Sequence, residues 1–64
     1  MMIIPEVHID SLANGGDGIG RISGKACFVP YTVPGDIADI EITETKKRYS
    51  RGRVARLKVP SPHR

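Results

Sequence analysis

Hydrophobic and polar residues alternate along most of this chain, in short runs that glycine and proline separate. The alternation predicts strands over residues 6–11 and 37–44, because successive side chains of a strand point to opposite faces. Three further short runs, residues 19–22, 25–29 and 52–59, complete a set of five strands. No helical period of useful length is present. We therefore expect an all-β fold, a small five-stranded barrel that is closed or nearly closed.

Glycine, proline and short polar residues predict the turns between these strands. Residues 13–18 (Ala-Asn-Gly-Gly-Asp-Gly) form a loop, because glycine adopts positive φ freely and Asn and Asp tolerate it. Ser23-Gly24 has the composition of a two-residue hairpin turn, and Pro34-Gly35 that of a type II turn. The glycines of residues 16–20 superficially resemble a phosphate- or S-adenosylmethionine-binding loop. Such a loop requires a helix after it, so a wide turn that enters a strand is favoured.

The length of 64 residues limits what this chain can do. A domain this small buries only about 60% of its unfolded surface, so we expect one domain of modest stability. It has no room for a catalytic cleft together with a cofactor pocket of roughly 300–1,000 Å³. Residues 1–6 lack the leader of a signal peptide, and no apolar run approaches the ~18 residues of a membrane span. We therefore expect a monomeric, cytoplasmic domain without membrane contact.

The thiol and imidazole side chains do not indicate a metal or catalytic site. Cys27 is the single cysteine, so an internal disulfide is impossible, which fits a reducing compartment. It lies mid-strand between Ala26 and Phe28, where we expect a buried thiol rather than a nucleophile. His8 and His63 lack the paired spacing that zinc ligands show. The sequence predicts no metal, no catalytic residue and no cofactor within this chain.

Charge is segregated along the sequence far more than the net charge of +3 indicates. Residues 1–45 contain two Lys or Arg against all seven acids, a formal balance of −5. Residues 46–64 contain the other eight Lys and Arg and no acid, a balance of +8. A one-sided basic segment favours a polyanionic partner and orients it, because the acidic part repels phosphates elsewhere.

The segment 46–53 (Lys-Lys-Arg-Tyr-Ser-Arg-Gly-Arg) carries five cations and one aromatic ring, within and just after the polar turn of residues 45–50. Cations at a barrel rim suit phosphate contacts, and a tyrosine can stack on a base, an interaction worth roughly 1–3 kcal/mol. The alternative is a solvated turn that is charged for solubility. It is less favoured, because no acid lies among the five cations.

Two more pairs of side chains extend this candidate surface. Arg21 and Lys25 flank the Ser23-Gly24 turn, and Phe28 and Tyr31 flank the Val29-Pro30 step. Phe28 fits either the core or an exposed face where a base stacks, and the core is favoured. The candidate nucleic-acid-binding residues are therefore Arg21, Lys25, Phe28, Tyr31, Lys46, Lys47, Arg48, Tyr49, Arg51, Arg53 and Arg56.

Two motifs resemble the TRAM domain family. Residues 12–21 read Leu-Ala-Asn-Gly-Gly-Asp-Gly-Ile-Gly-Arg, and residues 28–36 read Phe-Val-Pro-Tyr-Thr-Val-Pro-Gly-Asp. The spacing of Phe-Val-Pro, three residues and Pro-Gly-Asp is quite specific, and the resemblance runs from about residue 6 to residue 59. It implies an OB-like, five-stranded antiparallel β-barrel that binds RNA, of the kind appended to RNA-modifying enzymes.

The last residues, 57–64 (Leu-Lys-Val-Pro-Ser-Pro-His-Arg), resemble the junction after the TRAM domain of S-adenosylmethionine-dependent uracil-5 RNA methyltransferases. The resemblance implies that residues 1–59 are the N-terminal, RNA-binding TRAM domain and that residues 60–64 begin a linker. The parent enzyme would bind an rRNA or tRNA stem-loop and use S-adenosylmethionine, with an iron–sulfur cluster in many members. Cys27 matches neither the cluster ligands nor the catalytic cysteine, so this chain alone is expected not to methylate RNA.

Two other functions remain open at this point. The first is a stand-alone TRAM protein that binds RNA or acts as an RNA chaperone. The second is a protein-docking module whose basic segment contacts an acidic surface. The resemblance to a linker after residue 59 argues against the first, and the salt dependence of RNA binding would separate the second.

Overall fold

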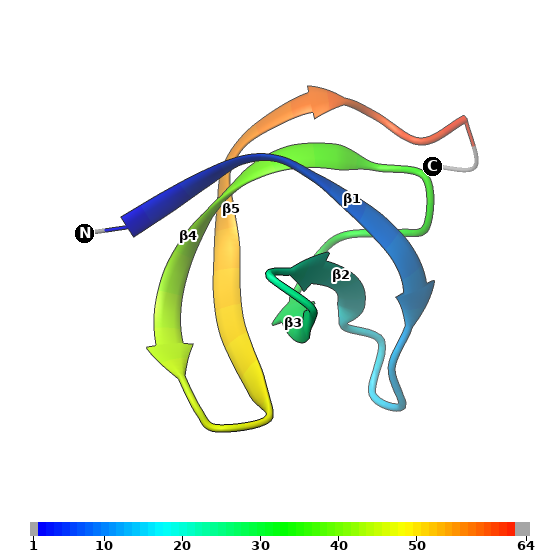
Figure 1. Ribbon diagram of the computed structural model, residues 1–64. Coiled ribbons are helices and arrows are strands. Elements are labelled where there is room, and N and C mark those ends of the chain that lie inside the picture. Colours follow the sequence, from blue (N-terminus) through cyan, green and yellow to red (C-terminus); the bar gives the residue numbers. More distant parts are fainter. Residues whose placement is uncertain (1, 63–64) are drawn as a thin grey trace.

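The computed structural model describes residues 2–62 as five strands wrapped into a closed barrel (Figure 1). The strands are β1 (Met2–Leu12), β2 (Gly18–Ile22), β3 (Lys25–Val29), β4 (Ile37–Thr45) and β5 (Tyr49–Val59). Their order around the barrel is β1-β2-β3-β5-β4, and β4 pairs with β1 to close it. All neighbours are antiparallel except β3 and β5, which are parallel. The predicted five-stranded, all-β barrel is confirmed, and the expected antiparallel pairing holds at every seam except that between β3 and β5.

Alternate residues of β1, β3 and β4 fill the interior. The buried core consists of six small or branched side chains, each at most 4% exposed: Val7, Ile9, Cys27, Val29, Ala38 and Ile40. The alternation predicted for residues 37–44 is confirmed, since Ala38 and Ile40 are fully buried. The expected buried thiol is confirmed as well, because Cys27 has no exposed surface.

On β5 the inward position that pairs with Ile42 is a glycine because no side chain fits there. A Cβ on Gly52 would lie 2.5 Å from Cγ2 of Ile40 and 2.8 Å from the carbonyl oxygen of Glu41. Cβ atoms in proteins essentially never make non-bonded contacts this short. Gly52 therefore lets β5 approach β4 closely enough for the small barrel to close without a void.

The predicted turns are confirmed. Ser23 and Gly24 both have positive φ, 53° and 81°, as a two-residue hairpin between twisted strands requires. At Pro34-Gly35, the amide of Asp36 donates to the carbonyl of Val33 (3.1 Å), and Gly35 has φ 98°. The glycine-rich loop leads directly into β2, so it is a wide turn and not a phosphate loop before a helix. None of the described residues forms a helix that could cross a membrane.

The first strand begins earlier than the alternation predicts, at Met2 instead of residue 6. The pairing of β1 with β4 shifts register between Ile4 and Val7, and Glu6 adopts a φ of 53° there. The displaced amide of Glu6 donates to Oδ1 of Asp39 (3.0 Å), which compensates for the lost ladder bond. Pro5 and this bulge conceal the first part of the strand at the sequence level.

The last strand also begins earlier, at Tyr49 instead of residue 52. Residues 49–51 pair in parallel with residues 26–28 of β3, which extends β5 past the point where alternation is visible. Only residues 46–48 therefore remain in the turn of the β4–β5 hairpin. Tyr49 and Arg51 are strand residues rather than turn residues, and their side chains have a defined direction.

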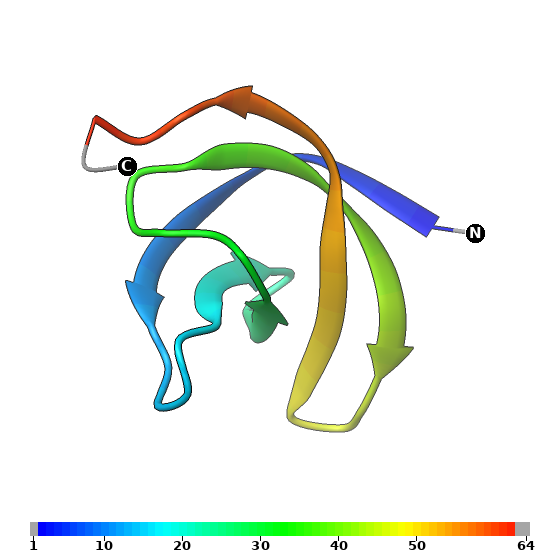
Figure 2. The ribbon, with the colours of Figure 1, turned by 180° about the vertical axis from the view of Figure 1, so that it is seen from behind.

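At the end of the barrel away from this hairpin, residues 33–36 and 60–62 lie together (Figures 1 and 2). Asp36 is fully buried, and its carboxylate accepts hydrogen bonds from the amides of Val33 (3.0 Å) and Ser61 (2.6 Å). The hydroxyl of Ser61 donates to the carbonyl of Pro34 (2.7 Å). We call these four residues the Asp36 clasp. His63 and Arg64 lie outside the described residues, and the linker that begins at residue 60 stays a prediction.

Candidate nucleic-acid interface

The turn of the β4–β5 hairpin presents cations at one end of the barrel. The amide of Lys46 donates to the carbonyl of Tyr49 (2.8 Å) and closes the turn. From β3, the ammonium of Lys25 donates to the carbonyl of Lys46 (2.6 Å), so its charge joins those of the hairpin. Lys47 and Arg48 are exposed and make no ion pair with any residue of the 2–62 range. Both are available for contact with phosphates.

Beside this turn, an aromatic pair lies on the outer face of the barrel. Phe28 follows buried Cys27 and precedes buried Val29, so its side chain points outward. Its ring meets the ring of Tyr49 at 5.5 Å between centroids and an interplanar angle of 76°, an edge-to-face contact. The core position favoured for Phe28 from the sequence is therefore wrong. The alternation of β3 places it on the surface, where β5 supplies a partner ring.

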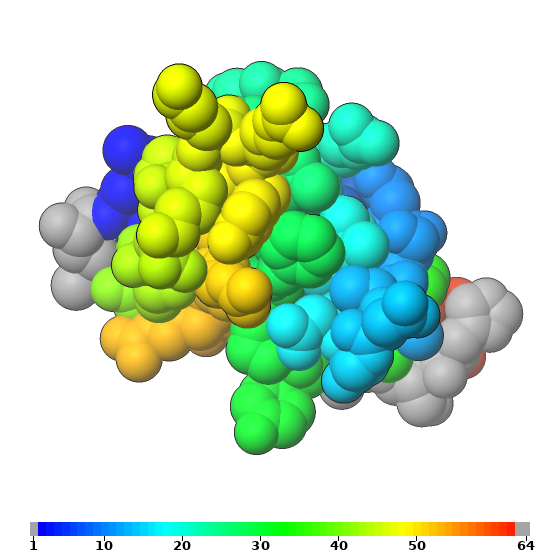
Figure 3. Space-filling model, turned by 90° about the horizontal axis from the view of Figure 1, so that it is seen from below, coloured from blue at the N-terminus to red at the C-terminus, as the bar shows by residue number. Residues whose placement is uncertain are grey.

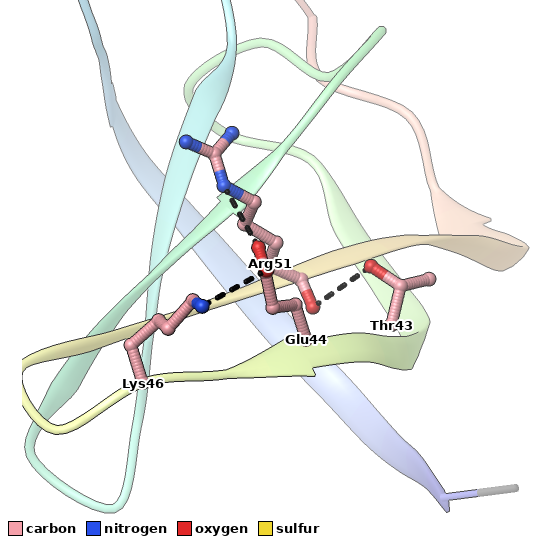
Figure 4. A network of polar contacts seen from close by, with 4 residues as sticks. All are labelled: Thr43, Glu44, Lys46 and Arg51. Atoms are coloured by element: carbon pink, nitrogen blue, oxygen red, sulfur yellow. Dashed lines mark hydrogen bonds and ion pairs between the residues drawn. The ribbon is translucent and has the colours of Figure 1, made fainter.

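The guanidinium of Arg51 covers both rings. Its Cζ lies 5.6 Å from the centroid of Tyr49 and 5.9 Å from that of Phe28, within the range of cation–π attraction. Nε of Arg51 is 3.4 Å from Oε1 of Glu44, and Oγ1 of Thr43 donates to the carbonyl oxygen of Arg51 (3.3 Å), as Figure 4 shows. These contacts hold a positive, planar group against the aromatic pair.

Acidic residues of β4 lie next to the cations of β5, which the charge segregation along the sequence does not predict. Glu44 contacts Nζ of Lys46 (3.2 Å) as well as Arg51, and Glu41 accepts a hydrogen bond from Nε of Arg53 (2.7 Å). The antiparallel hairpin causes this, because it sets Glu44 opposite Arg51 and Glu41 opposite Arg53. Exposed pairs of this kind are worth about 0–1 kcal/mol, so a phosphate can replace the carboxylate.

The aromatic pair and the loop of residues 13–17 enclose a shallow hollow. Its volume is about 370 Å³, and it is lined by Ala13, Asn14, Asp17, Phe28, Tyr49 and Arg51. Figure 3 looks onto this end of the barrel, with the yellow hairpin on one side, the blue and cyan loop on the other and green β3 residues between them. Asn14 and Asp17 were not candidates from the sequence. They belonged to a segment that reads only as a turn, and the barrel brings that turn to the aromatic pair.

A second hollow of about 550 Å³ lies on the other side of the same loop and is lined by Gly15, Gly16, Asp17 and residues 30–33. Tyr31 belongs to it. This side chain is 91% exposed, and its φ is 64°, a conformation that a residue with a Cβ adopts at a cost. Two hollows thus border the loop, one lined by Phe28 and Tyr49 and the other by Tyr31.

The other candidate residues lie elsewhere on the barrel. Arg21 is exposed on β2 and lines a separate hollow together with Glu6 and Asp10. Arg56 is exposed on β5 beyond the hairpin, opposite Asp39. The structure therefore gathers Lys25, Phe28 and the segment 46–51 at one end, with Arg53 one step further along β5. It does not bring Arg21 or Arg56 to that end.

The described part of the chain offers no site for the cofactors that the resemblance to RNA methyltransferases implies. Within residues 2–62, no three His, Cys, Asp or Glu side chains are placed to hold a metal ion. Cys27 lies in the core and has no exposed surface. The glycine-rich loop enters a strand, so it provides no helix N-terminus for the methyl donor. An iron–sulfur cluster and S-adenosylmethionine do not fit these residues.

A closed five-stranded barrel with half-buried aromatic rings on its outer face, beside a basic hairpin, has the architecture of a small nucleic-acid-binding module. The comparison with protein families agrees with this class. The model of the TRAM domain matches residues 4–55, which is most of the chain. The chain belongs to the TRAM domain family, as its two motifs predict.

Relatives of the chain are RNA methyltransferases. An uncharacterized RNA methyltransferase of Corynebacterium efficiens is 47% identical over 58 residues, which are 91% of this chain and 14% of that protein. The 23S rRNA (uracil(1939)-C(5))-methyltransferase of Tolumonas auensis is 42% identical over 59 residues, 92% of this chain and 13% of that enzyme. The enzyme of the same name from Yersinia enterocolitica is 47% identical over 51 residues, 80% and 12% of the two chains. The chain spans about an eighth of the length of these relatives.

A solved structure shares the fold. The solution structure of a conserved protein of Methanococcus maripaludis superposes with a TM-score of 0.75 at 32% sequence identity. The match covers 83% of this chain and 74% of the other. The same barrel therefore occurs in a protein only slightly longer than the matched region.

Proposed function

We propose that this chain is the RNA-binding domain of a uracil-5 RNA methyltransferase that acts on rRNA or tRNA. The observation that carries the proposal is the aromatic pair of Phe28 and Tyr49, covered by Arg51 and flanked by the cations of the hairpin. The relatives support the kind of parent enzyme, since two of them are named as 23S rRNA uracil-C5 methyltransferases. As in the expectation from residues 57–64, the domain would lie at the N-terminus of its parent.

Binding begins at the RNA backbone. Lys47 and Arg48 contact phosphates directly, while Lys46 and Arg51 exchange the Glu44 carboxylate for a phosphate. The aromatic pair then stacks on unpaired bases, which favours loops of a stem-loop over its paired stem. The same arrangement binds any sequence weakly, because backbone contacts and stacking do not depend on base identity.

The consequence for a parent enzyme is delivery of its substrate. A uridine must leave its stack before its C5 carbon can react, and single-stranded loops lower the cost of that step. A tethered domain that holds the same loop raises the effective concentration of the substrate at the catalytic domain. The methyl group itself comes from S-adenosylmethionine, which the remainder of such an enzyme would bind. The proposal places the domain in the cytoplasm as a monomer.

The test is a fluorescence titration of the chain with a uridine-containing stem-loop RNA at several salt concentrations. About five phosphate contacts on single-stranded RNA predict that log K falls with log salt at a slope of roughly −3.5. The variant K47Q/R48Q/R51Q removes three of these contacts, and we expect its slope to be weaker by about 2. The matched control R21Q/R56Q/K58Q removes the same charge from β2 and from the part of β5 beyond the hairpin, where Arg56 and Lys58 lie, and is expected to keep most of the slope.

Equal losses in the two variants would mean that net charge, and not the hairpin, attracts RNA. No binding of RNA by the folded chain would contradict the proposal and favour the docking module. The stand-alone alternative rests on the Methanococcus maripaludis protein, of which the matched barrel covers 74%. An RNA chaperone would melt a labelled hairpin at stoichiometric concentration, whereas a domain that only holds a loop would leave the stem paired.

A further inference from the structure

We propose that the hollow between the loop of residues 13–17 and the aromatic pair is a base pocket that prefers guanine. This inference rests on the proposed RNA binding and adds the identity of the base. The hollow, of about 370 Å³, has two aromatic rings and a guanidinium on one side and the loop on the other. A nucleobase that stacks on the first side therefore turns an edge toward the loop.

The loop presents a carboxylate to that edge. Asp17 is half-buried and lines the hollow, and its side chain has no hydrogen-bond or ion-pair partner within residues 2–62. Its backbone is fixed, because the carbonyl of Asp17 accepts a hydrogen bond from the amide of Ala13 (2.8 Å). The backbone that carries the carboxylate is therefore held at the wall of the hollow, and the carboxylate itself is not used by the fold.

An unpaired carboxylate is unfavourable in a surface that binds phosphates. It repels the RNA backbone, while nearby Glu44, by contrast, pairs with Lys46 and Arg51. Its presence is accounted for if the RNA group that reaches the hollow donates hydrogen bonds. Among RNA groups, base edges and the ribose 2′-hydroxyl carry such donors, whereas phosphates only accept, and a base stacked on the rings turns its edge toward the loop.

Guanine matches a carboxylate better than the other three bases do. Its Watson–Crick edge carries two neighbouring donors, N1–H and N2–H, which the two oxygens of Asp17 can accept together. Adenine and cytosine offer one amino group beside an acceptor nitrogen, and uracil offers one N–H between two carbonyls, so each would set an acceptor against the carboxylate. Asn14, from the same loop, lines the hollow and has an amide that can donate to O6 of guanine.

The test compares single-stranded oligouridine RNAs that carry one central guanosine, inosine or adenosine. Inosine lacks only the N2 amino group, so it removes one donor from the RNA without any change in the protein. We expect guanosine to bind about tenfold tighter than adenosine, with inosine between them. The variant D17N is expected to abolish the difference between guanosine and inosine. D10N changes an exposed acid on β1 and is expected to preserve it.

The outcomes distinguish failure of the guanine pocket from failure of RNA binding. Equal affinity for guanosine, inosine and adenosine RNAs, with the salt slope and the hairpin dependence intact, would overturn the guanine pocket and leave the RNA-binding function standing. A guanosine preference that D17N does not alter would assign it to another part of the surface and would also overturn this inference. Absence of binding to every RNA would remove both proposals.

Discussion

Carboxylates at the two ends of this barrel have opposite surroundings. Asp36 is fully buried, and backbone amides of Val33 and Ser61 donate to it at 3.0 and 2.6 Å. Glu44 is exposed at the other end and is shared between the flexible side chains of Lys46 and Arg51. The donors to Asp36 are backbone amides, which the fold holds in place. The partners of Glu44 are side chains, which can turn toward another anion.

The difference separates the residues that hold the fold from those that bind. A buried carboxylate with charge-assisted hydrogen bonds is strongly coupled to stability, because its loss strands the donors. An exposed ion pair adds little to stability, so a ligand anion can replace its carboxylate at little cost to the fold. Substitutions at the Asp36 clasp should therefore change unfolding, and substitutions at the hairpin should change affinity.

The largest expected effect is on stability and follows from Asp36→Ala. This variant loses two charge-assisted hydrogen bonds and leaves the amides of Val33 and Ser61 unpaired, at a cost of about 3 kcal/mol or more. A 64-residue domain has only a few kcal/mol of stability, so much of the variant will be unfolded at 37 °C. Urea unfolding followed by circular dichroism measures the change.

Asp10→Ala is the matched control for the clasp. Asp10 is exposed on β1 and has no partner within residues 2–62, so its removal should shift unfolding by less than about 0.5 kcal/mol. Similar losses in the two variants would show that the clasp is not special. Asp36 would then contribute no more to the free energy of unfolding than an exposed carboxylate does.

A smaller effect, on affinity, is expected for Tyr49→Ala. The variant removes one ring of the aromatic pair and with it the stacking on a base, worth about 1–3 kcal/mol, or roughly 5- to 150-fold in the Kd for stem-loop RNA. Tyr49→Phe keeps the ring and should keep most of the affinity. If the two variants lose affinity equally, the hydroxyl group and not the ring makes the contact.

The smallest effect is expected for Glu44→Gln, and its sign is informative. Without the carboxylate, Lys46 and Arg51 no longer have an internal competitor for phosphate, so RNA affinity should rise by about two- to fivefold. The free energy of unfolding should change by less than about 1 kcal/mol. Asp10→Asn removes a negative charge away from the hairpin and serves as the control. A decrease in affinity with Glu44→Gln would mean that Glu44 positions Arg51 rather than competing for it.

Much of the fold could be predicted from the sequence because the signals are local. Strand alternation in residues 37–44 and the Ser23-Gly24 and Pro34-Gly35 turns depend on neighbours along the chain, and each is confirmed. The early start of β5 depends instead on its parallel pairing with β3, which no local pattern reveals. The TRAM motifs predicted the family that the comparisons show.

The sequence predicted which segment forms the candidate surface, but not how its side chains pair or which way they point. Five cations in residues 46–53 are visible in the sequence, but their pairing with Glu41 and Glu44 depends on the register of the hairpin. Phe28 could be placed outside the core only once its neighbours Cys27 and Val29 were known to point inward. Asn14 and Asp17 carried no signal of their own, since their role depends on the closure of the barrel.

The parallel contact between β3 and β5 has a consequence for how the barrel opens. It consists of three residue pairs, Ala26 with Tyr49, Cys27 with Ser50 and Phe28 with Arg51, and is the only parallel seam among residues 2–62. It joins segments more than twenty residues apart, so its closure costs more loop entropy than closure of the β2–β3 and β4–β5 hairpins. The aromatic pair spans this seam, one ring from each strand. A ligand bound across both rings would hold β3 and β5 together, so RNA binding would stabilise the closed barrel.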